Sequence, residues 1–134
     1  MTVERINPPQ LIPPHGHTHV VQVTGGATLY LAGQSAFTAD SRLVGEGDHY
    51  AQTQQAFRNV LIALASADAT WRDVVKATYY VVDVRPETLD AFVRAMNDVL
   101  GTDAEPPPAA TFVGVASLAY PEMLVEIDVI AVRG

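Results

Sequence analysis

The sequence predicts an α+β fold of two layers, in which two helices cover one face of a six-stranded mixed sheet. Three observations support this prediction: six segments have strand-like patterns, two segments carry apolar residues at helical spacing, and no linker or internal repeat separates them. The segments follow the order β-β-β-α-β-α-β-β. With 134 residues, the chain is expected to form a single domain, residues 1–134, around one hydrophobic core.

The first part of the chain is expected to supply three strands. A short edge strand is predicted at 3–6, before the proline-rich loop 8–16, where prolines remove donors from any ladder. Residues 17–23 and 28–32 then have strand character, and Gly25-Gly26 between them is a turn sequence. These two strands are therefore predicted to pair as a hairpin.

The middle of the chain is expected to supply two helices on either side of a strand. Asp48 is a good N-cap type for a first helix running to about Ala67. Residues 73–82 are apolar on both faces, as in a central strand. Proline in the first turn of Arg85-Pro86-Glu87 is typical of a second helix start. The buried stripe expected on the second helix is Leu89, Phe92, Val93, Met96 and Leu100.

The last part of the chain is expected to form a hairpin of two strands, 106–118 and 123–132, around a turn at 120–122. In the second strand every odd position is apolar, which predicts a face buried under the helices. The even positions place Glu126 and Asp128 among aliphatic residues. A face that mixes acids and aliphatic side chains indicates a pocket or a subunit interface.

The composition excludes several classes of function. Eight Lys and Arg against 15 Asp and Glu give a net charge of −7 without a basic cluster, so nucleic acid is not an expected partner. The chain has no cysteine, which excludes disulfides and thiolate chemistry. Neither a signal-peptide h-region nor a membrane span is recognisable, so a cytoplasmic protein without membrane contact is expected.

Several motifs in order resemble the Rid (YjgF) superfamily. They are the Pro-Ala-x-Thr sequence at 108–111, the Val-Glu-Ile-Asp sequence at 125–128, and the upstream segments 31–34, 52–60 and 74–78. The resemblance covers the chain from about Val20 onward. It implies a chorismate-mutase-like fold, a homotrimer with pockets between subunits, and hydrolysis of reactive enamines or imines. Some relatives carry a ribonuclease label, to which the charge of this chain lends no support.

The resemblance also implies which residues form the pocket. Glu126 matches the family carboxylate proposed to activate water, and with His17 it is the expected catalytic pair. The family arginine that binds the substrate carboxylate is Ala110 here, so a simple 2-imino acid would lose its anchor. His17 and Val93 stand where the family has tyrosine and asparagine. The expected substrate-binding residues are His19, Ala32, Gly33, Val93, Ala110, Thr111 and Phe112.

Other interpretations of these residues stay open at this point. Glu126 is equally suited to an interface hydrogen bond or salt bridge, and Asp128 to an ion pair with a nearby basic residue. If His15, His17 and His19 alternated along a strand, they would point to one side as a metal site with Glu126. Pocket lining is the favoured interpretation, and neither a metal nor a cofactor is expected. Arg94, next to Val93, is expected to be a solvated arginine rather than a substitute anchor.

Two functions of different classes follow. The first is an enzyme that hydrolyses or tautomerises a small imine, enamine or carbonyl metabolite, with a substrate altered by the loss of the arginine at Ala110. The second is a non-catalytic trimeric module that binds a small molecule or a protein.

Overall fold

A computed structural model describes all residues, 1–134, and has the predicted order of elements. The strands are β1 (Thr2–Ile6), β2 (Val20–Thr24), β3 (Ala27–Tyr30), β4 (Val74–Val82), β5 (Ala109–Val115) and β6 (Val125–Arg133). The helices are α1 (His49–Ala65) and α2 (Pro86–Leu100), and the 3₁₀ turns η1 (Trp71–Asp73) and η2 (Gly101–Ala104) precede β4 and β5. The fold class and the order of elements are thus confirmed.

The six strands are divided between two sheets rather than joined in one. The larger sheet has the order β3-β6-β4-β5, and β1 pairs only with β2 in a two-stranded sheet. Both predicted hairpins are wrong. β3 pairs with β6 instead of β2, and β5 and β6 lie on opposite sides of β4 instead of pairing with each other. β4 runs parallel to β5 and antiparallel to β6, so the larger sheet is mixed, as predicted.

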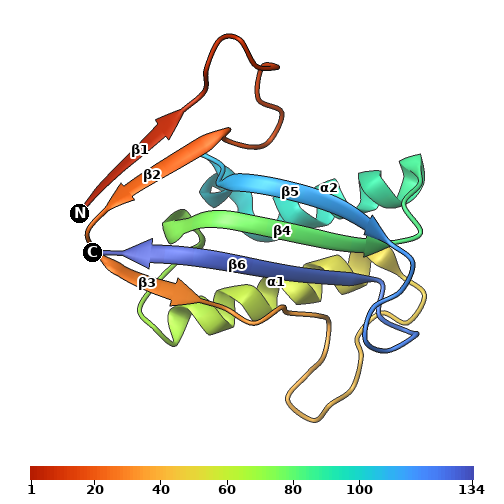
Figure 1. The fold of residues 1–134 in the computed structure, drawn as a ribbon. Coiled ribbons are helices and arrows are strands. Elements are labelled where there is room, and N and C mark those ends of the chain that lie inside the picture. The colour runs from red at the N-terminus through yellow and green to blue at the C-terminus, as the bar shows by residue number, and fades with distance from the viewer.

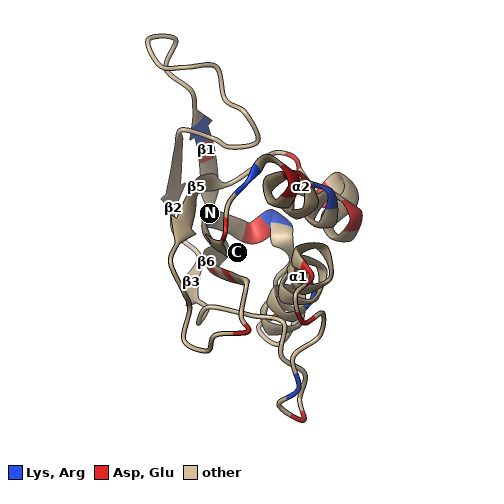
Figure 2. Ribbon diagram, turned by 90° about the vertical axis from the view of Figure 1, so that its right-hand side faces the viewer, with Lys and Arg blue, Asp and Glu red and all other residues tan.

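β4 is a central strand of the larger sheet, but only one of its two apolar faces is covered within a single chain. It is hydrogen-bonded on both edges, and the helices cover one of its faces, as Figures 1 and 2 show. On β6 the predicted alternation is confirmed. Met123, just before the strand, and Val125, Ile127, Val129 and Ala131 within it are all buried. This face contributes to the hydrophobic core, whose burial favours docking of the helices on the sheet.

Phe57 of α1 lies at the centre of the core and is fully buried. Its ring centroid lies 5.5 Å from Trp71, 5.9 Å from Tyr79 and 5.8 Å from Phe92. Tilted and edge-on aromatic contacts at these separations favour packing beyond the area that they bury. Trp71, between α1 and β4, is therefore a core residue.

The predicted stripe of α2 is partly wrong. Phe92 and Leu100 are buried, whereas Leu89 and Val93 are 42% and 41% exposed. Thr88 and Ala95 take their place in the buried face. The reason is that α2 lies at the edge of the helical layer, so one flank of its apolar stripe faces outward instead of α1. That flank forms a wall of the site described below.

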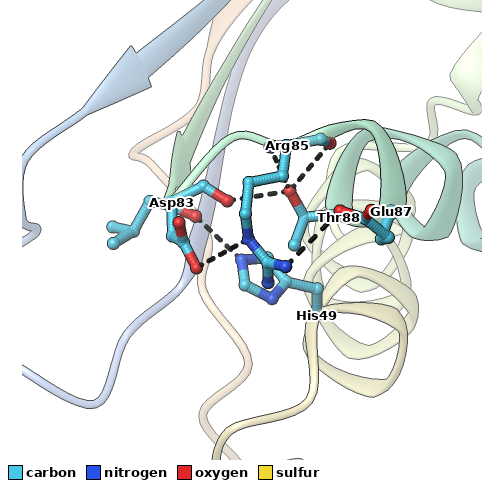
Figure 3. Close-up of polar contacts among 6 residues, drawn as sticks. His49, Asp83, Arg85, Glu87 and Thr88 are labelled. Carbon is cyan, nitrogen blue, oxygen red and sulfur yellow. Dashed lines mark hydrogen bonds and ion pairs between the residues drawn. The ribbon is translucent and has the colours of Figure 1, made fainter.

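The beginnings of both helices are fastened to the end of β4 (Figure 3). The His49 ring shares a hydrogen bond of 2.8 Å with the carbonyl oxygen of Val82, which links α1 to the strand. Thr88 donates a hydrogen bond to the Asp83 carbonyl and accepts one from the Arg85 amide, each 2.8 Å long. These bonds satisfy polar groups at the start of α2. They hold α2 beside β5, where the candidate site lies.

Neither helix has the length and apolar character that crossing a bilayer requires.

Candidate functional site

An apolar pocket lies between α2, β5 and the loop before β2. Its volume is about 420 Å³, and most of its lining is hydrophobic. The lining residues are His15, Gly16, His17, Tyr79, Leu89, Phe92, Val93, Met96, Ala110 and Phe112. Four of the predicted site residues, His17, Val93, Ala110 and Phe112, therefore meet in one pocket.

Strand register explains why Ala110 and Phe112 face this pocket. Ala110 pairs with Ala77 of β4, which is fully buried under the helices, and side chains at paired positions share a face. Phe112 points the same way, and its ring lies edge-on to Phe92 of α2 at 5.3 Å between centroids. The floor of the pocket is thus apolar at the position where the family resemblance expects an arginine.

His17 is held at the pocket by the loop that precedes β2. The Thr18 amide donates a 3.0 Å hydrogen bond to the Pro108 carbonyl, and the Thr18 hydroxyl donates a 2.6 Å bond to the Pro107 carbonyl. Gly16, with φ of +71°, makes the sharp turn before His17 that an L-residue rarely adopts. The loop is therefore anchored to the segment that leads into β5, and His17 is positioned beside Ala110 and Phe112.

The three histidines do not form the alternating row that a metal site would need. Residues 17–19 are loop rather than strand, since β2 begins at Val20. The His19 ring shares a 2.7 Å hydrogen bond with the Ile12 carbonyl, and its ring packs edge-on against His17. No group of three or more His, Asp or Glu side chains is placed to hold a metal ion. The metal hypothesis therefore lacks the geometry on which it was based, and His19 does not line the apolar pocket.

Glu126 lies on the opposite face of the sheet from the apolar pocket. Its neighbours along β6, Val125 and Ile127, point into the helical core, so its own side chain points away from the helices. Gly33 lies against it: a Cβ atom on Gly33 would stand 2.8 Å from the carboxyl carbon of Glu126. The segment of Gly33 is held there by two hydrogen bonds of 2.8 and 2.9 Å between the backbones of Gln34 and Ile127.

Two further polar residues share the face of Glu126. Asp128 accepts a 3.3 Å hydrogen bond from the Tyr80 hydroxyl, and the charge of Asp128 raises the pKa of that phenol. Thr111 accepts a 2.9 Å hydrogen bond from Lys76. The expected ion pair between Asp128 and Arg72, Lys76 or Arg94 is therefore absent. The partner of Asp128 is instead Tyr80, which the sequence did not predict. Tyr80 also lies directly opposite Glu126 in the register of β4 and β6.

The predicted site is thus split into two groups within one chain. His17, Val93, Ala110 and Phe112 lie on the helix side, and Gly33, Thr111 and Glu126 belong to the opposite side. Ala32 lines neither group and borders a separate hollow between β3 and the end of α1. Glu126 and His17, expected as a catalytic pair, do not share a pocket in a single chain. Alternation along a strand explains the division, because Ala110 and Thr111 are neighbours in sequence but point to opposite faces.

Arg94 is a solvated surface arginine, as predicted. Its Nε atom pairs with Asp90 at 2.8 Å, and its guanidinium carbon lies 5.0 Å from the ring centroid of Tyr50. Both groups lie on the outer surface of the helices. Arg94 therefore does not replace the missing arginine in the apolar pocket.

Comparisons with known proteins agree on one family. Residues 11–133 match the family model described as Endoribonuclease L-PSP. A RutC family protein of Synechocystis sp. is 32% identical over 98% of this chain and 98% of its own length. The crystal structure of YyfB from Yersinia pestis, described as a protein of unknown function of the conserved Rid family, superposes with a TM-score of 0.87. It is 40% identical, over 99% of this chain and 100% of its own. Rv2704 from Mycobacterium tuberculosis, a member of the YjgF/YER057c/UK114 family, gives a TM-score of 0.64 at 30% identity, over 88% of this chain and 87% of its own.

The mixed sheet with two helices on one face places the chain in the chorismate-mutase-like class of α+β domains. Within that class, the chain belongs to the Rid/YjgF family.

Proposed function

We propose that this Rid-family protein is a hydrolase that acts on a small imine or enamine with an apolar body. The proposal is supported mainly by the apolar pocket, where Ala110 and Val93 stand at the positions of the family arginine and asparagine and Phe112 adds an aromatic wall. None of these side chains can form the paired, charge-assisted hydrogen bonds with which an arginine binds a carboxylate. The substrate therefore has no carboxylate on the reacting carbon, where a 2-imino acid has one.

Glu126 is the proposed general base in this reaction. It is the carboxylate that the family resemblance retains, and it packs directly against Gly33, where a Cβ atom would not fit. Glu126 would orient a water molecule and accept its proton as the water oxygen bonds to the imine carbon. The carbon–nitrogen bond then breaks, and the nitrogen leaves with the protons that the water supplied. The overall reaction converts one imine and one water molecule into the corresponding carbonyl compound and ammonia.

Because Glu126 and the apolar pocket are separated within one chain, the proposed reaction takes place between copies of the chain. In a homotrimer, the open sheet face of one copy would bring Glu126 to the apolar pocket of its neighbour, where His17 lies. The open face suits an interface because it mixes aliphatic and aromatic side chains with Glu126 and Asp128, and the aromatic side chain of Tyr30 at its edge is 80% exposed. The trimer is the assembly that the family resemblance implies, and a cytoplasmic location remains part of this proposal.

The alternative is a trimeric module that binds a small apolar molecule without turning it over. One observation favours it: Glu126 and the pocket residues do not meet in one chain, so catalysis depends entirely on how copies associate. Tautomerisation of a carbonyl compound with Glu126 as the base is a second reaction for the same residues. Ribonuclease activity has little support, because Figure 2 shows Lys and Arg dispersed over the ribbon and the net charge is −7.

The decisive experiment is ammonia release from a panel of imines generated in situ, some with and some without a carboxylate on the imine carbon. Wild type is expected to hydrolyse the imines with apolar groups, and Glu126→Gln to lose about 10²-fold or more of that rate. Ala110→Arg is expected to shift preference toward 2-imino acids. Binding of apolar carbonyl compounds with no turnover of any imine or carbonyl substrate would favour the binding module. A wild type that prefers 2-imino acids would contradict the proposal.

A further inference from the structure

Arg5 of β1 has a guanidinium group that no residue of the protein satisfies. Its Nε atom is buried and has no hydrogen-bond partner. Arg5 is also absent from the ion pairs of the structure, which involve Arg42, Arg72, Arg85 and Arg94. Most buried polar groups in proteins have a hydrogen-bond partner, and a buried donor on a charged group is costly without one. The arrangement at Arg5 therefore suggests a site for a ligand.

Arg5 faces a polar pocket of about 340 Å³ that contains no hydrophobic residue. β1 brings Arg5 to it, the loop before β2 contributes His17 and Thr18, and the segment before β5 contributes Glu105. The Thr18 hydroxyl is already bonded to Pro107. Arg5 is therefore the strongest donor available to a ligand in this pocket.

The polar pocket adjoins the apolar pocket of the proposed active site. Gly16 and His17 line both of them, so the two hollows lie on either side of one turn of the chain. A third hollow, between α2 and Pro107, shares Gly16 with both. The body of a small molecule in the apolar pocket would therefore lie one turn of the chain away from Arg5.

We propose that Arg5 binds a carboxylate at the far end of the substrate, several bonds away from the reacting carbon in the apolar pocket. A carboxylate matches the charge and the planar fork of a guanidinium, and the part of Arg5 that lines the polar pocket is available to it. The substrate class is then an ω-carboxylate with an apolar body, rather than a 2-imino acid. This inference rests on the proposed function only in using the apolar pocket as the binding place of the substrate body.

Glu105 provides a second test of whether the ligand bound at Arg5 is negatively charged. Its side chain is exposed at the rim of the same pocket, and it forms no ion pair with Arg5. The negative charge of Glu105 opposes a bound carboxylate. Removal of this charge is therefore expected to strengthen acid binding, whereas removal of the Arg5 charge weakens it.

The test measures binding without turnover, by calorimetry or by NMR titration of the whole 134-residue chain. The probes are phenylacetate, 3-phenylpropionate and 4-phenylbutyrate, each compared with its neutral amide. Wild type is expected to bind at least one acid about tenfold or more tightly than its amide. Arg5→Gln should abolish that preference without weakening the amide, and Glu105→Gln should increase it. Arg42→Gln is the charge-matched control, because Arg42 is exposed and pairs with Asp40.

The outcomes separate this inference from the proposed function. Equal binding of acid and amide by wild type, an acid preference that survives Arg5→Gln, or no binding of any acid would each overturn the role of Arg5. Those results would not decide whether the protein hydrolyses imines, which the ammonia-release assay tests separately. An acid preference that depends on Arg5, in a protein without imine hydrolysis, would confirm the carboxylate site and contradict the proposed reaction.

Discussion

Gly33 and Glu126 are in direct contact across the edge of the sheet: a Cβ atom on Gly33 would lie 2.8 Å from both the carboxyl carbon and Oε1 of Glu126. Real side chains do not tolerate such an approach, so either the backbone at 33 or the carboxylate would have to move. Gly33 has no positive φ, so its value lies in the space that it leaves and not in an unusual backbone conformation.

Gly33→Ala is therefore expected to displace the Glu126 carboxylate. If Glu126 is the base, imine hydrolysis should fall about tenfold or more, because small errors in position are costly to catalysis. The free energy of unfolding should change by about 1 kcal/mol or less, since Glu126 is partly exposed and can rotate. The matched control is Gly114→Ala, whose Cβ would contact Val84 at 3.1 Å and should leave the rate unchanged. A full rate in Gly33→Ala would argue against Glu126 as the base.

Gln52 is a buried polar residue of α1 that joins three separate segments. Its amide nitrogen donates to the Gly45 and Glu122 carbonyls at 3.1 and 3.0 Å, and its oxygen accepts from the Leu124 amide at 2.8 Å. Gln52→Leu would leave these backbone groups without partners, each at a cost of about 1–3 kcal/mol.

The expected result is a loss of at least about 2 kcal/mol in the free energy of unfolding, measured by urea denaturation. Gln55→Leu is the control, because Gln55 is only partly buried and bonds a single side chain, Asn59. It should cost less than about 1 kcal/mol. Equal losses in both variants would show that the Gln52 hydrogen bonds do not stabilise the fold.

Phe57 belongs to the core, whereas Phe112 belongs to the wall of the apolar pocket, so replacing each by alanine should have a different effect. Phe57→Ala should destabilise the protein by about 3–5 kcal/mol, because the ring is fully buried and the surrounding aromatic cluster cannot close the cavity. Phe112→Ala should cost less, since Phe112 is 37% exposed and mainly contacts Phe92. Thermal or urea unfolding measures both. In Phe112→Ala, binding of apolar ligands should weaken; unchanged binding would place the ligand elsewhere.

Tyr50 supplies a pH-dependent contact between the two helices. Its hydroxyl donates a hydrogen bond to Asp98, which raises the pKa of the phenol above the usual value of 10.0. A pKa raised in the folded state means that this contribution to stability is complete below pH of about 10 and is lost as the pH rises through the raised pKa.

In Asp98→Asn, the pKa of Tyr50 should move back toward its ordinary value, because the negative charge beside the phenol is gone. Ultraviolet titration of the phenols measures this, with Tyr50→Phe used to assign the signal. Asp103→Asn is a control, since Asp103 pairs with Arg72 and not with Tyr50. A Tyr50 pKa that stays the same in Asp98→Asn would refute the assignment of the shift to Asp98.

Local sequence pattern was enough to predict the order of elements, the fold class and the buried face of β6. The patterns are alternation of period two on β6, helical spacing around Phe57, and the N-cap at Asp48, which accepts a 3.0 Å hydrogen bond from the Ala51 amide. The motifs of the sequence also predict that Ala110 stands at the position of the family arginine, and this stays a prediction. The apolar character of the pocket around Ala110 follows from the same residues.

Strand pairing depends on the tertiary fold, and strand pairing in turn decides which side chains lie in the same site. β3 and β5 each pair with a strand distant in sequence, a choice that depends on how the helices pack and not on the turns nearby. The same pairing sends Ala110 and Glu126 to opposite faces, so residues expected in one site lie on two surfaces. Arg5 carried no local signal at all. Its unpaired guanidinium and its place beside His17 arise because β1, the loop before β2 and the segment before β5 converge only in the folded chain.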